Sequence, residues 1–194
     1  MTPAGYMAKR VVNRPDWLLS GRVSSIYSLS GCISEDFTDY IDCWKHNGYW
    51  LFDSPAEIID VAHEKKVDLA DTVLFFYEVH EQEFNEGKWT PFEAETSFHT
   101  DVKIPEKKVL EGYDVVTFFV RSSPECSPLS CNGLADKVET NSRCLLESFG
   151  QAHHLLENGA FNDSEPGPYR IFAVYSVVGW SRGVASGIPE SVAR

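Results

Sequence analysis

The residues of this chain best placed to do chemistry are two cysteines in the segment Ser122–Leu134, SSPECSPLSCNGL. Two prolines and an Asn-Gly pair accompany Cys126 and Cys131, and this composition indicates a loop of defined shape directly after a predicted strand. The residues after Cys131 predict a short helical turn from Leu134 to Val138. Because a helix N-terminus lowers the pKa of a thiol, Cys131 is predicted to be the more reactive of the two cysteines.

A base for such a cysteine is available on the helix predicted for residues 143–157. A helical wheel places His153 on the apolar side and His154 on the polar side. The resulting hypothesis is a cysteine-dependent enzyme with Cys131 as nucleophile, His153 as base, and Asn132 or backbone amides stabilising an oxyanion. The structural alternative is a hydrogen-bonded core histidine and two small packing cysteines.

Metal binding is a further alternative for the same residue types. Thiolate and imidazole are zinc ligands, so a zinc site can be built from Cys126, Cys131, Cys144 and either His153 or His154. The C-x4-C spacing lacks the C-x2-C knuckle that is typical of structural zinc sites. Glu78 and His80, with His99, form a second possible cation site, whose alternative is a solvated, charged hairpin edge.

Sequence motifs for bound cofactors are missing from the chain. It has no Walker A sequence, no G-x-G-x-x-G, no H-E-x-x-H, no G-x-S-x-G and no EF-hand loop. The sequence therefore predicts no cofactor.

The acidic residues are concentrated in one segment. The 194 residues carry a formal net charge of −12, and residues 35–101 hold 17 acidic residues but only four lysines. Aromatic anchors within a charged rim are typical of electrostatically steered interfaces. The favoured hypothesis is therefore a binding or inhibitory protein that recognises a basic protein partner through this segment; its predicted contact residues are Asp36, Asp39, Asp42, Trp50, Glu78, Glu81 and Trp89. A small-ligand domain is the third hypothesis.

Composition excludes several other functions. A negative net charge of this size disfavours nucleic acid and anionic membrane surfaces as partners, because proteins bind both largely through Lys and Arg side chains. The apolar runs are too short to span a bilayer, and the first residues contain no signal-peptide core. Five cysteines without a regular framework suit a reducing compartment, so we expect a cytoplasmic protein with free thiols.

Periodicity in the first half of the chain predicts helices and a hairpin. Residues 35–46 and a segment beginning at Ser54 predict helices, the second with Pro55 at its first position and Glu57 completing a capping box. Strands are predicted at residues 49–52, 72–84, 88–92 and 98–104, with a hairpin turn at residues 85–87.

The second half predicts the centre of the sheet. Residues 113–120 and 169–178 are apolar on both faces, which is typical of central strands. The mixed order of elements predicts a single α+β domain over residues 1–194, with a mainly antiparallel sheet, about three helices and flexible ends near residues 1–12 and 181–194. No internal repeat is apparent.

Overall fold

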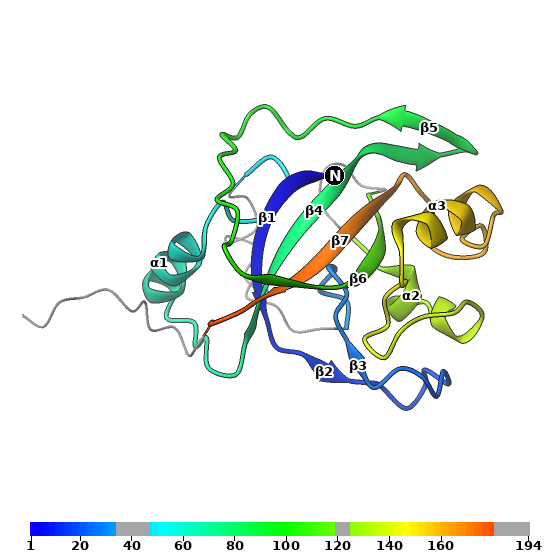
Figure 1. The fold of residues 1–194 in the computed structure, drawn as a ribbon, viewed down its shortest axis with the longest axis horizontal. Helices are drawn as coiled ribbons and strands as arrows, with labels where there is room; N and C mark the ends of the chain where they lie inside the picture. Colours follow the sequence, from blue (N-terminus) through cyan, green and yellow to red (C-terminus); the bar gives the residue numbers. More distant parts are fainter. Residues whose placement is uncertain (34–46, 119–124, 181–194) are drawn as a thin grey trace, which may run out of the picture.

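A mainly antiparallel sheet forms the centre of the computed structural model, which describes residues 1–33, 47–118 and 125–180 (Figure 1). The strand order is β1 (Thr2–Lys9), β4 (Val73–Asn85), β7 (Tyr169–Val177) and β6 (Lys108–Thr117), and all neighbours are antiparallel. β5 (Lys88–Pro91) pairs with the far end of β4. The predicted α+β class is confirmed.

The other elements lie around this sheet. Strands β2 (Val12–Asn13) and β3 (Ser25–Ile26) form a separate two-stranded ladder. The helices are α1 (Pro55–Lys65), the short α2 (Pro128–Cys131), the 3-10 helix η2 (Leu134–Asp136) and α3 (Phe149–Glu157). Every helix among the described residues falls short of the length and apolar character that a bilayer crossing requires. The helix predicted at residues 35–46 lies outside the described residues.

Local sequence signals account for α1 and for the β4–β5 hairpin. The Ser54 hydroxyl accepts a hydrogen bond from the amide of Glu57, and the Glu57 carboxylate accepts one from the amide of Asp53. The first bond satisfies an amide that the first helical turn leaves free, as the predicted cap requires, whereas the second reaches the residue before the N-cap instead of the N-cap amide of a capping box. Glu86 and Gly87 both have positive φ, 47° and 78°, which matches the twist of a two-residue hairpin. The helix after Ser54 and the hairpin are confirmed.

The fold contains an internal structural repeat that the sequence analysis missed. Asn47 accepts hydrogen bonds from the amides of residues 49 and 51 through its side-chain oxygen and donates to the Ala4 carbonyl. Asn141 accepts from the amides of residues 143 and 145 and donates to the Glu111 carbonyl. Each turn ends in a residue that bridges an outer strand, Phe52 to β1 and Leu146 to β6.

The same repeat continues into the helices and the sheet. Ser148 and Gln151 cap α3 as Ser54 and Glu57 cap α1. Each half is therefore an outer strand, a long connection, an asparagine turn, a capped helix and an inner strand. The inner strands pair with each other at Tyr77 and Val174, where a pseudo-two-fold axis relates the halves. Only three of eleven aligned positions, in residues 47–57 and 141–151, are identical, so the repeat is hard to see in the sequence.

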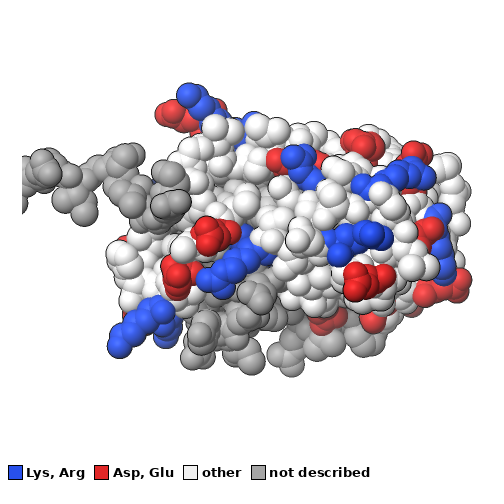
Figure 2. All heavy atoms as spheres, turned by 90° about the horizontal axis from the view of Figure 1, so that it is seen from below, with Lys and Arg blue, Asp and Glu red and all other residues white. Residues whose placement is uncertain are grey.

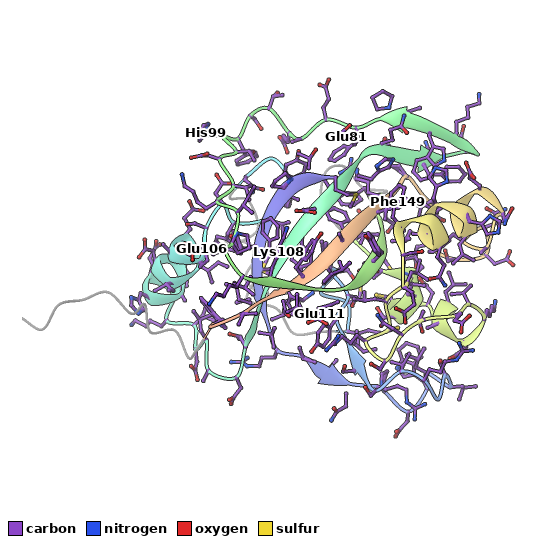
Figure 3. The ribbon with its side chains drawn as sticks, in the orientation of Figure 1. Glu81, His99, Glu106, Lys108, Glu111 and Phe149 are labelled. Carbon is purple, nitrogen blue, oxygen red and sulfur yellow. The ribbon has the colours of Figure 1, made fainter. Side chains whose placement is uncertain are left out.

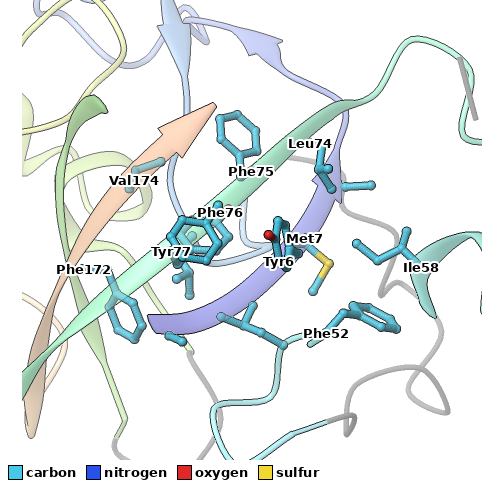
Figure 4. Packing of buried hydrophobic residues seen from close by; sticks show 14 of the residues in the cluster. Tyr6, Met7, Phe52, Ile58, Leu74, Phe75, Phe76, Tyr77, Phe172 and Val174 are labelled. Carbon is cyan, nitrogen blue, oxygen red and sulfur yellow. The ribbon is translucent and has the colours of Figure 1, made fainter. Parts of the chain in front are cut away.

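Two hydrophobic clusters flank the sheet, and each takes residues from both halves. The first joins β1 and β4 to α1 and includes Tyr6, Phe52, Ile58 and Phe76 (Figure 4). The second joins the β6–β7 side to α3 and α2, with Val115, Ile171 and Leu156 at its centre. Both sheet faces are thus packed in the middle, which explains the continuous apolar runs of β4 and β7.

Several expectations were wrong because tertiary contacts decided them. Residues 2–9 are not a loose end but form β1 in the sheet. Residues 98–104 are not a strand. The amide of Asp101 donates a hydrogen bond to the Asp53 carboxylate, and the amide of Lys103 donates one to the Asp53 carbonyl, so these amides bond to Asp53 instead of to a neighbouring strand. The predicted strand at residues 49–52 is reduced to one bridging residue.

The second half also departs from expectation in two places. The third helix begins at Phe149 rather than Arg143, because the Asn141 turn and the Leu146 bridge occupy the preceding residues. β7 is central as predicted, whereas β6 lies at the end of the strand path, and in the described part of the chain its outer edge pairs through single bridges to residues 126 and 146. The predicted loose end at residues 181–194 lies outside the described residues.

Candidate thiol site

Three cysteines converge where the long connections of the two halves meet. The Sγ atoms of Cys32, Cys126 and Cys131, here called the thiol cluster, all lie within 4.8 Å of one another. Cys32 lies in a turn on the first connection and is exposed, Cys126 is buried, and Cys131 is half-buried. No other group of three metal-ligating side chains comes this close within residues 1–33, 47–118 and 125–180.

Two serines join the connections beside the cluster. The amide of Ser30 donates to the Ser127 hydroxyl at 3.3 Å, and the amide of Ser127 donates to the Ser30 hydroxyl at 3.0 Å. The Ser30 hydroxyl also lies 3.5 Å from the Cys131 sulfur. Both serines are almost fully buried. Because each hydroxyl has a fixed partner, the two backbones keep a fixed separation, and Cys32 is held near Cys126 and Cys131.

Lys9 and Asp114, two buried residues of the sheet, hold the same two connections by hydrogen bonds. The Lys9 ammonium on β1 donates to the carbonyls of residues 28, 29 and 30 at 2.6, 2.8 and 3.1 Å. On β6, the Asp114 carboxylate accepts the Leu29 amide and the Ser127 hydroxyl, at 2.8 and 2.7 Å. Lys9 and Asp114 are at most 1% exposed. A charge at this depth is costly unless it is hydrogen-bonded, so these contacts fix the path of the first connection.

The three thiols shift one another's pKa values in opposite directions. Hydrogen bonds from Cys126 and then from Cys131 to the Cys32 sulfur lower the pKa of Cys32, and the Lys9 charge adds to this effect. Donating to Cys131 and Cys32 raises the pKa of Cys126. For Cys131 the hydrogen bond with Cys126 lowers the pKa, but its bond with Cys32 and its burial outweigh that effect, so its pKa is raised. The cluster therefore favours a thiolate on Cys32 over one on Cys126 or Cys131.

Oxygen atoms complete the surroundings of the cluster. The Cys32 sulfur lies 3.0 Å from the Glu125 carbonyl oxygen, and the Cys126 sulfur lies 3.2 Å from the side-chain oxygen of Asn132. The Asn132 amide in turn donates to the Glu165 carboxylate at 3.3 Å. Sulfur and oxygen donors thus lie together at the cluster.

The predicted environment of Cys131 was wrong. The predicted helical turn does follow, as the 3-10 helix η2, but its N-cap is Gly133. Cys131 is instead the last residue of α2, so it gains no stabilisation from a helix N-terminus. Cys126 and Cys131 do converge, but with Cys32 instead of Cys144 and a histidine. Cys144 is fully buried in the second hydrophobic cluster, and burial raises its pKa to about 12.

His153 lies in a different setting from Cys131. Its ring stacks on Trp89 at 4.4 Å, and its Nδ1 lies 3.3 Å from the Glu157 carboxylate. His154, one residue on, contacts the Asn158 side chain. Within the described part of the chain, no hydrogen bond, ion pair or ring contact joins either histidine to Cys131. The predicted nucleophile and base are therefore not in contact.

The predicted acidic contact residues are partly used within the chain. Glu78 binds Lys108 at 2.5 Å and accepts the Tyr175 hydroxyl, and the Trp89 indole donates to Glu157. Glu81 is an exposed residue of β4 itself, whereas Lys108 is the first residue of β6 (Figure 3). Trp50 is half-buried within the Asn47 turn.

Other members of the acidic segment give no further support to a single acidic face. Asp36, Asp39 and Asp42 lie outside the described residues, so the acidic interface stays a prediction. Figure 2 shows one face of the molecule, on which basic and acidic side chains are interspersed.

The alternative cation site was wrong as well. His80 packs against the rings of Trp89 and Phe149 at 5.6 and 4.8 Å, and Glu78 is paired with Lys108, so neither is directed at a shared ion with His99. Burial and the neighbouring His153 both lower the pKa of His80, with burial the larger cause.

Sequence reasoning missed Cys32 as a site residue. It lies 94 residues before Cys126, and no local motif surrounds it. The usable signal was Lys9, which directly follows Tyr6, Met7 and Ala8 at the end of β1. An ammonium buried there needs several carbonyl partners and so indicates a loop folded over it.

Asp114 gives the site a testable pH dependence. Burial raises its pKa to about 6, although the Ser127 and Leu29 hydrogen bonds oppose the shift. The pKa of an aspartate in the unfolded chain is about 3.9, so between pH 4 and 6 the native state keeps Asp114 protonated while the unfolded state does not. This contribution to stability is lost as the pH rises through that window. We expect the free energy of unfolding of the wild type, minus that of Asp114→Asn, to fall by roughly 2–3 kcal/mol from pH 4 to pH 7. Urea unfolding of both proteins, reduced and metal-free, measures this difference. A difference that does not change with pH would contradict the raised pKa of Asp114.

Comparison with protein-family models, curated proteins and solved structures finds no match to this chain. The fold and the site therefore define it only as an α+β protein with an internal repeat and a thiol cluster between its two halves.

Proposed function

We propose that this protein binds a thiophilic metal ion of the Zn²⁺ class through Cys32, Cys126 and Cys131. The observation that carries the proposal is the approach of the three sulfur atoms to within 4.8 Å of one another. In a tetrahedral zinc site with Zn–S bonds of about 2.3 Å, two sulfur atoms lie about 3.8 Å apart. Closing the cluster by about 1 Å requires only small side-chain rotations.

Charge and anchoring support the same proposal. Three thiolates around a divalent ion leave a net charge of −1, and Lys9 is close enough to stabilise negative charge on Cys32. Lys9, Asp114, Ser30 and Ser127 hold the two connections in place before any ion arrives. Such supporting contacts orient ligands and raise metal affinity.

The fourth coordination position is open to exchange. The donors nearest to the thiols are oxygens, the Asn132 side chain and the Glu125 carbonyl, rather than a fourth thiolate or imidazole. Cys32 is exposed, so water also reaches this side. Structural zinc sites are closed by four protein ligands, whereas three protein ligands with a free position are typical of sites that bind and activate a further molecule.

Cobalt titration tests the proposal. Reduced protein is expected to bind Co²⁺ with a sulfur-to-cobalt charge-transfer band that Zn²⁺ abolishes by displacement. Cys32→Ser, Cys126→Ser and Cys131→Ser are each expected to weaken Co²⁺ binding by at least about 100-fold, since a hydroxyl replaces a thiolate ligand.

Cys144→Ala is the matched control, because it removes a thiol that lies outside the cluster. It is expected to bind Co²⁺ like the wild type. Absence of the charge-transfer band in the wild type, or equal binding by all four variants, would overturn the proposal.

A further inference from the structure

We propose that the thiol cluster is also a redox-controlled site, in which a hydroperoxide oxidises Cys32 to a disulfide with Cys126 or Cys131 and thereby abolishes metal binding. The regulatory consequence rests on the proposed metal binding, whereas the oxidation chemistry requires only the thiols.

Differences in exposure set the order of reaction. Among the three residues Cys32 is exposed, Cys131 is half-buried and Cys126 is only 7% exposed, so a peroxide in solvent reaches Cys32 most readily. Two further sulfurs lie within 4.8 Å of it, which is close enough to resolve an oxidised intermediate before a second peroxide arrives. An exposed cysteine with a neighbouring resolving cysteine is the arrangement found in redox-sensing sites.

The backbone around the cluster lets the sulfur atoms approach. Cys32 lies in a turn beyond the contacts that Lys9 makes with residues 28–30. Cys126 is bridged to Thr117 on β6, and Cys131 ends α2. Cys32 is therefore the only one of the three that neither bridges a strand nor belongs to a helix, and the distance between sulfur atoms must close from at most 4.8 Å to about 2 Å.

The chemistry balances with the peroxide as the only co-reactant. The Cys32 sulfur attacks one peroxide oxygen, the O–O bond breaks, and Cys32 sulfenic acid and one water result. The neighbouring thiol then attacks the sulfenic sulfur, an S–S bond forms, and the hydroxyl leaves with the thiol proton as a second water. Two thiols have been oxidised and one hydrogen peroxide reduced. A disulfide sulfur is not a thiolate ligand, so only one of the three metal ligands remains.

The experiment begins with reduced, metal-free wild-type protein and one equivalent of hydrogen peroxide. The expected product has lost two titratable thiols and about 2 Da. Peptide mapping is expected to link Cys32 to Cys126 or Cys131. Cys32→Ser is expected to form no disulfide under these conditions, and Cys144→Ala is expected to react like the wild type. A disulfide that excludes Cys32, or equal oxidation of Cys32→Ser, would overturn the proposal.

A second measurement separates this inference from the proposed function. Oxidised protein is expected to bind Co²⁺ at least about 100-fold more weakly than reduced protein, with full recovery after dithiothreitol treatment. Reduced protein that binds Co²⁺ while the oxidised form binds it equally well refutes redox control alone. Reduced protein that fails to bind Co²⁺ refutes the metal site itself, whatever the peptide map shows.

Discussion

Replacing Gly112 by alanine is expected to lower the free energy of unfolding by about 3–5 kcal/mol, among the largest effects of any single substitution in this chain. Gly112 has a φ of +145° at the bulge where β6 meets the Asn141 turn. A Cβ at this position would lie 2.7 Å from the Cβ of Leu145 and 2.8 Å from the carbonyl oxygen of Leu146. The second atom is backbone held by the bridge to Tyr113, so the turn itself must move.

Gly5 provides an internal replicate of this prediction. Its φ is +136°, and an added Cβ would lie 2.7 Å from both the Leu51 Cβ and the Phe52 carbonyl oxygen. Gly5→Ala is therefore expected to cost about as much as Gly112→Ala. The two glycines lie on the outer strands of the four-strand path, about 14 Å apart, so the double variant is expected to show the sum within about 0.5 kcal/mol.

Two further glycines separate the causes in a urea unfolding experiment. Gly87 also has positive φ, +78°, but an added Cβ there meets nothing within 4 Å, so Gly87→Ala measures the backbone cost alone, about 1–2 kcal/mol. Gly21 has neither positive φ nor a close neighbour, and Gly21→Ala is expected to change stability by less than about 0.5 kcal/mol. If Gly112→Ala cost no more than Gly87→Ala, the close approach of the turn would be ruled out as its cause.

Replacing Lys9 by methionine is the second large effect, expected to lower the free energy of unfolding by about 3–5 kcal/mol. The change keeps the length of the side chain but removes the ammonium that donates hydrogen bonds to the carbonyls of residues 28, 29 and 30. Those carbonyls cannot reach water without moving the first connection, so the loss exceeds that of an ordinary hydrogen bond.

The same variant links stability to the thiol site. Because residues 28–30 lead directly to Cys32, Lys9→Met is expected to weaken Co²⁺ binding at least about 10-fold in protein that is still folded. Lys88→Met, on the exposed β5 strand, is the control and is expected to leave both quantities unchanged. Unfolding curves and cobalt titrations of the two variants measure the effects. Unchanged stability in Lys9→Met would contradict the proposed anchoring.

Elements whose signals are local were predictable. α1 begins at Pro55 because the Ser54 cap, the proline and Glu57 lie within four consecutive residues, and the β4–β5 hairpin follows from Glu86 and Gly87. The predicted third helix starts six residues before α3 does. The pattern of apolar residues cannot distinguish a helix from an asparagine turn that buries Leu145 and Leu146.

The candidate site was predictable only in part. The unusual composition of their loop predicts Cys126 and Cys131 as site residues, and both belong to the thiol cluster. Their partner was not predictable, since Cys32 is brought to them by long-range contacts: the Ser30–Ser127 hydrogen bonds and the anchors Lys9 and Asp114 on opposite outer strands of the sheet. His153 was chosen by helical geometry, which describes a side chain's direction but not what lies opposite it.

The sequence by itself determined the α+β class, the capped helix after Ser54 and the apolar strands at the centre, because propensity, capping and burial patterns act over a few residues. The tertiary structure alone decided that the two halves repeat, that a charged lysine lies in the sheet, and that three cysteines from two connections meet. Such contacts depend on packing between segments about 100 residues apart, and no local pattern of residue types records that distance.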